Sequence, residues 1–104
     1  MLAYTTVAAI KKILQVDESD TSLDAEITDA LPTGDAYVDN LLKADGLVVP
    51  SPVPQSVADA AAHFDAWIVR RRRDPVGAEA FYVEANRFLD AYAKAEAETY
   101  VGSA

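Results

Sequence analysis

Apolar residues recur at helical spacing in four stretches of this chain, and that pattern most restricts what it can fold into. No segment shows the sustained apolar–polar alternation that is typical of a strand. The four stretches predict helices over about residues 6–15, 22–44, 56–73 and 76–98. We therefore expect an all-α fold, a small bundle of four helices.

The second predicted helix contains two residues that disfavour a helix interior, Pro32 and Gly34. An interior proline costs about 3 kcal/mol. The apolar face nevertheless keeps its phase across them, from Ile27 to Val38. We expect a helix kinked at Pro32–Gly34, or two coaxial segments, ending at Gly46.

The segment "GLVVPSPVPQ" follows, with three prolines in five residues. Proline removes backbone donors and pushes the preceding residue out of the helical region, so an extended loop is expected. This loop is also apolar, and Val48, Val49 and Val53 are its candidate contact residues. They either cover the protein's own core or meet a neighbouring subunit, and the pattern favours neither.

Composition excludes several classes of function. The 104 residues are 51% hydrophobic and include no cysteine, so one folded domain is expected without disulfides, thiolate catalysis or cysteine-bound zinc. Seventeen acidic residues face nine basic ones, which disfavours a general affinity for duplex DNA. The same acidity is compatible with a halophilic host. The sequence contains no run of 18 apolar residues, so it predicts no membrane span.

Residues that carry enzyme chemistry are sparse. The single histidine, His63, lies at the edge of an apolar helix face and has no partner at a metal-ligand spacing. The acidic clusters are typical of solvated faces and helix caps, and no glycine-rich phosphate loop occurs. We expect no enzyme activity, catalytic residue, cofactor or metal site.

Four consecutive arginines, Arg70, Arg71, Arg72 and Arg73, stand at the end of the third predicted helix, before Asp74-Pro75. Cations there complement the negative end of the helix dipole. The arginines could bind carboxylates such as Asp74, Glu79 or Glu84 locally, bridge to a neighbouring subunit, or contact DNA phosphates. The acidic background and the use of arginine alone favour carboxylates over phosphates.

The order of these features resembles the small helical head–tail connector proteins of tailed viruses, the adaptor or head-completion group. The matching stretches cover nearly the whole chain: "YTTVAAIKKIL", "LDAEITDALPTGDAYVDNLL", "VVPSPVPQSVADAA", "AAAHFDAWIVRRRRDP" and "AEAFYVEANRFLDAYAKAE". Pro32 and Gly34 depart from the simplest pattern of that family.

The resemblance implies a virion structural protein. Such adaptors form a homo-oligomeric ring, commonly a dodecamer, beneath the portal protein, extending the DNA channel and linking capsid to tail. Residues 1–98 would be the connector domain. Residues 99–104 would be a flexible portal-docking tail comprising Thr99, Tyr100, Val101, Gly102, Ser103 and Ala104. The arginine run and the valine loop would lie at subunit interfaces.

The implied partners are the portal, other neck or tail proteins and further copies of the chain. Genomic DNA would pass without specific binding, and no membrane is involved. The implied location is the virion neck, after synthesis in the host cytoplasm. A stopper position in the neck is equally compatible with the sequence. The alternative from another class is a small helical regulatory or nucleic-acid-binding protein that uses Arg70–Arg73.

Overall fold

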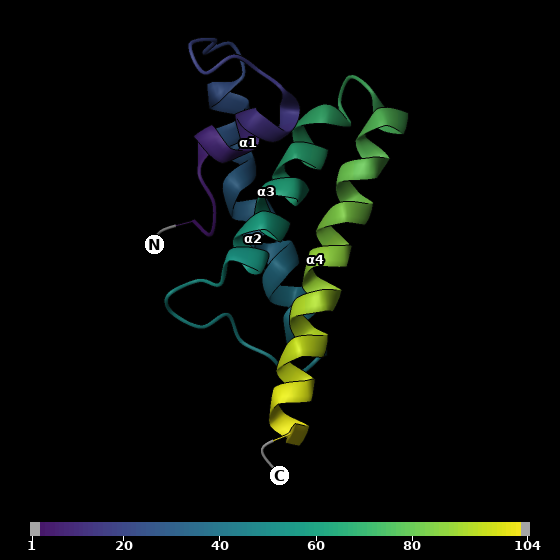
Figure 1. Ribbon diagram of the computed structural model, residues 1–104. Helices are drawn as coiled ribbons and strands as arrows, with labels where there is room; N and C mark the ends of the chain where they lie inside the picture. Colours follow the sequence, from purple (N-terminus) through teal and green to yellow (C-terminus); the bar gives the residue numbers. More distant parts are fainter. Residues whose placement is uncertain (1–2, 103–104) are drawn as a thin grey trace.

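The computed structural model describes residues 3–102, with side chains up to residue 97, and over that range it contains four helices and no strand. These are α1 (Val7–Leu14), α2 (Asp24–Ala44), α3 (Gln55–Arg70) and α4 (Pro75–Gly102). The predicted all-α fold is confirmed. In Figure 1, α3 lies at the centre, with α1 beside its upper half, α2 crossing behind it and α4 along its other side.

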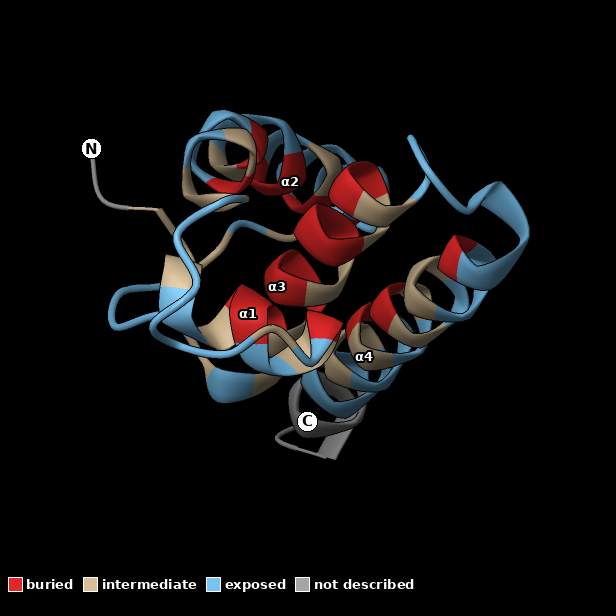
Figure 2. Cartoon of the chain, turned by 90° about the horizontal axis from the view of Figure 1, so that it is seen from above, coloured by how far each residue is buried: buried red, intermediate tan, exposed pale blue. Residues whose placement is uncertain are grey.

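Helix α3 is the element around which the others pack. It contacts all three other helices, most extensively α4 and α2. Figure 2 shows buried positions along its length. Small residues make this possible, because alanine lets helix axes approach closely. The buried alanines of α3 are Ala60, Ala61, Ala62 and Ala66.

Two apolar clusters form the core. One joins α1 and the first half of α2 to the second half of α3, around Ile10, Ile27 and Val69. The other joins the second half of α2 to α3 and α4, around Phe64. Tyr37 packs against both clusters and stacks on Phe64, with 5.4 Å between ring centroids.

Helix α2 is a single element through Pro32, although proline cannot donate to the carbonyl four residues earlier. The expected bend at Pro32–Gly34 stays a prediction. The expected stop at Gly46 is confirmed. Gly46 adopts φ +75°, and the amide of Leu47 donates to the carbonyl of Leu42 at 2.9 Å. This is the Schellman arrangement that ends many helices.

Two predicted helix ends were wrong. Helix α3 ends at Arg70, and residues 71–73 form a turn instead of a further helical turn. The reason is Asp74, whose carboxylate accepts from the amide of Gly77 at 2.9 Å and caps α4, with Pro75 as its first residue. Helix α4 also runs to Gly102, past the expected end near residue 98.

The last turns of α4 extend beyond the other helices (Figure 1). At 28 residues, α4 is about 42 Å long at 1.5 Å per residue. The longest dimension of the molecule is 51 Å. Of the predicted docking tail, residues 99–102 lie in the helical backbone and their side chains lie outside the described part, as do Ser103 and Ala104 entirely.

Candidate interaction surfaces

The four arginines lie together at the end of α3, and each has a partner within the chain. Arg70 donates to the backbone carbonyl of Leu14 at 3.2 Å, and its guanidinium lies 5.7 Å from the centre of the Phe81 ring. Arg71 lies over the Trp67 ring at 4.2 Å. These two therefore tie the turn to α1 and to the aromatic residues beside it.

Arg72 and Arg73 bind one carboxylate, that of Glu26 in the first turn of α2. Arg72 donates to Oε1 at 2.9 Å, and Arg73 donates to Oε1 and Oε2 at 3.2 and 3.0 Å. The hydrogen bonds from Arg73 and then Arg72 lower the pKa of Glu26. The predicted preference for a carboxylate thus holds within the chain, but none of the suggested partners is the one observed. Asp74 caps α4, and Glu84 pairs with Arg87.

The guanidinium groups of Arg72 and Arg73 remain accessible to solvent despite these contacts. The side chains of Arg72 and Arg73 remain 55% and 60% exposed. Two guanidinium groups share one carboxylate, so this end of the molecule keeps exposed positive charge against an acidic background. Whether a neighbouring molecule contacts them stays a prediction.

The proline-rich loop divides its apolar residues between the core and solvent. Leu47 and Val49 pack against the second core cluster. Val48 is 86% exposed, and Val53 is also exposed. The loop therefore covers part of the core through Leu47 and Val49, so Val49 packs within the chain, whereas contact of Val48 and Val53 with a neighbouring subunit stays a prediction. Its Ser51–Pro52 peptide bond is cis.

The loop and the arginine turn lie at opposite ends of α3 (Figure 1). A helix of 16 residues separates them by about 24 Å. The predicted interface residues therefore form two surfaces, not one. We call Arg70–Arg73 the arginine end and Val48 with Val53 the valine loop.

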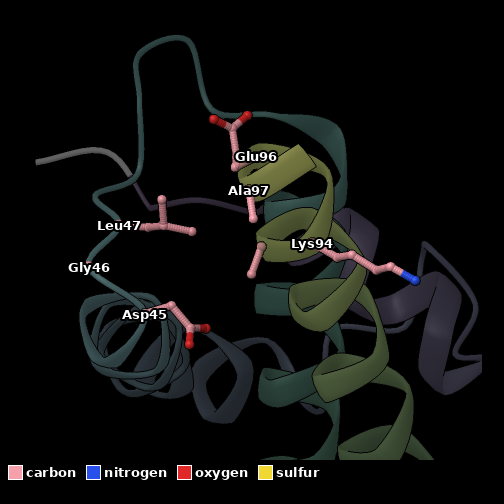
Figure 3. Close-up of a pocket in the computed structure, with 7 residues that line it drawn as sticks. Asp45, Gly46, Leu47, Lys94, Glu96 and Ala97 are labelled. Carbon is pink, nitrogen blue, oxygen red and sulfur yellow. The ribbon is translucent and has the colours of Figure 1, made fainter. Parts of the chain in front are cut away.

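An open depression of about 650 Å³ lies between residues 45–47, which follow α2, and residues 93–97 of α4. Figure 3 shows its lining residues, with Leu47 and Ala97 facing the space and the Lys94 ammonium pointing away from Asp45. The carboxylates of Asp45 and Glu96 are the acidic groups here.

The N-terminal segment crosses α2 and is held by carboxylates. The amide of Tyr4 donates to both carboxylate oxygens of Asp35 at 3.3 Å, and the Tyr4 hydroxyl donates to Asp39 at 2.6 Å. The bond to Asp39, with burial, raises the pKa of Tyr4 to about 12. Burial raises the pKa of Asp35 as well.

His63 has a structural environment. Its Nδ1 lies 2.7 Å from the carbonyl of Asp59, so Nδ1 carries the proton and donates. Its ring lies 5.2 Å from that of Phe88. Among residues 3–97, no group of three or more histidine and carboxylate side chains is placed to hold a metal ion. Within the same range, no helix is long and apolar enough to cross a bilayer.

Two buried acids were not predicted from the sequence, Asp35 in α2 and, in the middle of α3, Asp65. Asp65 is completely inaccessible to solvent. A signal was present, because Asp65 lies one turn from Ala61 and from Val69, inside an apolar face.

Comparisons with known proteins give no relative. No protein-family model matches the chain. No curated protein and no solved structure is significantly similar to it. The function must therefore be argued from the residues and their arrangement.

Proposed function

We propose that this chain is a virion structural protein, a head–tail adaptor that forms a homo-oligomeric ring beneath the portal of a tailed virus. The ring would extend the DNA channel and link the capsid to the tail. The virion neck is its proposed location, and the portal and other neck proteins are its proposed partners. We also propose that α2 bends at Pro32–Gly34 and that the proline-rich loop is extended.

The observation that carries the proposal is the placement of two different exposed surfaces at opposite ends of α3. The arginine end is cationic and the valine loop is apolar, so each would meet a different part of a neighbouring subunit, the arginines its acidic surface and the valines an apolar one. A contact between unlike patches of identical subunits is heterologous, and it generates a ring when the rotation closes. This arrangement therefore supports a head-to-tail ring.

The acidity of the chain supports the same role. Each subunit carries a formal net charge of -8, so a ring would repel the phosphates of passing DNA. The arginine end supports phosphate binding less well, because Glu26 already occupies two of its four guanidinium groups. A nucleic-acid-binding function remains the competing hypothesis, and the exposed guanidinium groups of Arg72 and Arg73 are the structural feature in its favour.

The proposal is tested by electron microscopy of the protein mixed with the portal protein of the same virus. Wild-type protein should give ring density under the portal. Val48→Asp should stay folded, because Val48 is 86% exposed, but should lose the ring. Val83→Asp is the matched control, since Val83 is an exposed valine of α4 outside both surfaces. Absence of rings with wild-type protein would contradict the proposal.

One further variant and one further measurement separate the parts of the proposal. Deleting residues 99–104 should leave the helical circular dichroism intact and abolish co-purification with the portal. Unchanged co-purification would show that the tail does not dock. DNA binding is measured against salt in parallel. Affinity with a steep salt slope near 50 mM would favour the nucleic-acid alternative, because each phosphate contact releases counterions.

A further inference from the structure

Asp65 lies at the contact between α3 and α2, where it faces Gly34. A β-carbon built on Gly34 would lie 1.8 Å from Asp65 Oδ1 and 2.6 Å from Cγ. The carboxyl group therefore occupies the notch left by the missing side chain of Gly34. Neither carboxyl oxygen makes a hydrogen bond of good geometry with a described residue, and the backbone of Gly34 interacts only weakly with the carboxyl group.

Among the residues whose side chains are described, no cation faces this carboxyl group from the elements packed around it. On its own helix, the residues one turn away are apolar: Ala61, Ala62, Ile68 and Val69. Arg70 is directed to Leu14 and Phe81. The charged group that acts on Asp65 from α2 is Asp35, which is also negative when ionised.

The neighbouring helices α1 and α4 do not supply a counter-ion either. The ammonium of Lys11 in α1 binds Asp24 at 2.8 Å and the carbonyl of Glu18 at 3.1 Å. In α4, Arg87 pairs with Glu84. An ionised carboxylate buried without a partner is strongly unfavourable, so such a group takes up a proton instead.

We propose that Asp65 is a proton-binding site that latches α2 to α3: the protonated side chain permits the close contact at Gly34, and loss of the proton releases it. The proposal concerns the helix contact itself and does not depend on the adaptor function. It assigns a role to Gly34 as well, since only glycine leaves room for the carboxyl group.

Burial and then the charge of Asp35 raise the pKa of Asp65 to about 8, with a smaller opposing effect of the Gly34 backbone. The side chain is therefore mostly neutral at pH 7. Ionisation requires water or another donor to reach both oxygens. The carboxyl group already fills the notch beside Gly34. To admit water or another donor, α2 must therefore move away from α3.

The direction of the pH effect follows from this shift. The folded state holds its proton up to about pH 8, whereas the unfolded chain releases it near 3.8. Between these values the folded state binds more protons, so stability falls as pH rises, and it levels off above pH 8. Each pH unit inside the window changes the unfolding constant by about tenfold for one proton.

The test compares the pH dependence of unfolding for wild type, Asp65→Asn and Asp65→Ala by urea denaturation between pH 5 and 9. The ratio of the wild-type unfolding constant to that of each variant should rise about tenfold per pH unit from 5 to 7 and flatten above 8. Asp90→Asn removes an exposed carboxylate of α4 and should keep the wild-type slope.

If both Asp65 variants fail to fold, two measurements on the wild-type protein test the proposal. The carbon-13 shift of the Asp65 carboxyl in wild-type protein should stay at the protonated value at pH 7. The amides of α2 around Gly34 should lose protection against hydrogen exchange above pH 8 before those of α4. Titration of Asp65 near pH 4, or a pH slope shared by wild type and both variants, would overturn the proposal.

Discussion

Replacing Gly34 with alanine tests whether the α2–α3 contact depends on the Asp65 carboxyl group. The new β-carbon would lie 1.8 Å from Asp65 Oδ1, more than 1 Å closer than the 3.0 Å that real β-carbons keep. Overpacking of this kind costs about 1–3 kcal/mol. Alanine in place of glycine in a helix returns about 0.5–1 kcal/mol. We expect a net loss of about 1–2 kcal/mol in the free energy of unfolding.

The sign of this effect should invert when the carboxyl group is absent. The three atoms nearest to the built β-carbon all belong to Asp65. In an Asp65→Ala background, Gly34→Ala should therefore stabilise the protein by about 0.5–1 kcal/mol, its helix-propensity gain. The double-mutant cycle should give a coupling energy of about 1–3 kcal/mol, measured by urea denaturation at pH 6.

Gly77→Ala is the matched control, because a β-carbon there would lie 2.0 Å from Asp74 Oδ2. Asp74 is exposed and can rotate away, losing one capping bond worth about 1 kcal/mol against a similar propensity gain. We expect almost no net change and no coupling to Asp65. If Gly34→Ala destabilised the protein equally in both backgrounds, the close contact with Asp65 would not be its cause.

Three further predictions concern the side-chain pairs that hold the N-terminal segment, α1 and the arginine end to α2. Lys11→Met should cost about 1–3 kcal/mol in urea denaturation, because the 5% exposed ammonium binds a carboxylate that the variant leaves unpaired. Tyr4→Phe should cost about 0.5–1.5 kcal/mol at pH 7. Since the pKa of Tyr4 is raised to about 12, absorbance at 295 nm should show it ionising above pH 10, and its contribution should be lost between pH 10 and 12. Glu26→Gln should lower the melting temperature less than Gly34→Ala does, and added salt should shrink its effect.

The helices could be predicted because their apolar periodicity is strong, whereas two of their ends could not. Arginine is a good helix former, so residues 71–73 extend the helical pattern of α3 by composition alone. The competing signal was Asp74-Pro75, which is a cap followed by a first helical residue and so requires a turn before it. The pair Asp74-Pro75 therefore predicts where α4 begins and also that α3 must end before it.

The partners of the arginines lay beyond sequence reasoning for a different reason. Glu26 is 46 and 47 residues away from Arg72 and Arg73. Local spacing suggests only partners within one or two turns, such as Asp74 and Glu79. Which distant carboxylate meets the turn depends on how α2 packs against α3, and the periodicity of each helix alone does not fix that.

Glu26 holds α2 to the turn that follows α3, and Asp65 lies at the contact of α2 with α3 itself, and the two contacts respond differently to salt. The ion pair of Glu26 with Arg72 and Arg73 is exposed, so salt weakens it, since the Debye length is only about 3 Å at 1 M. A protonated Asp65 carries no charge, so salt does not screen the contact that it permits. In concentrated salt, the contact between α2 and α3 should therefore depend more on the proton of Asp65 than on the ion pair. Glu26→Gln should then have its smallest effect under these conditions, while Asp65→Asn keeps its full effect on the pH slope.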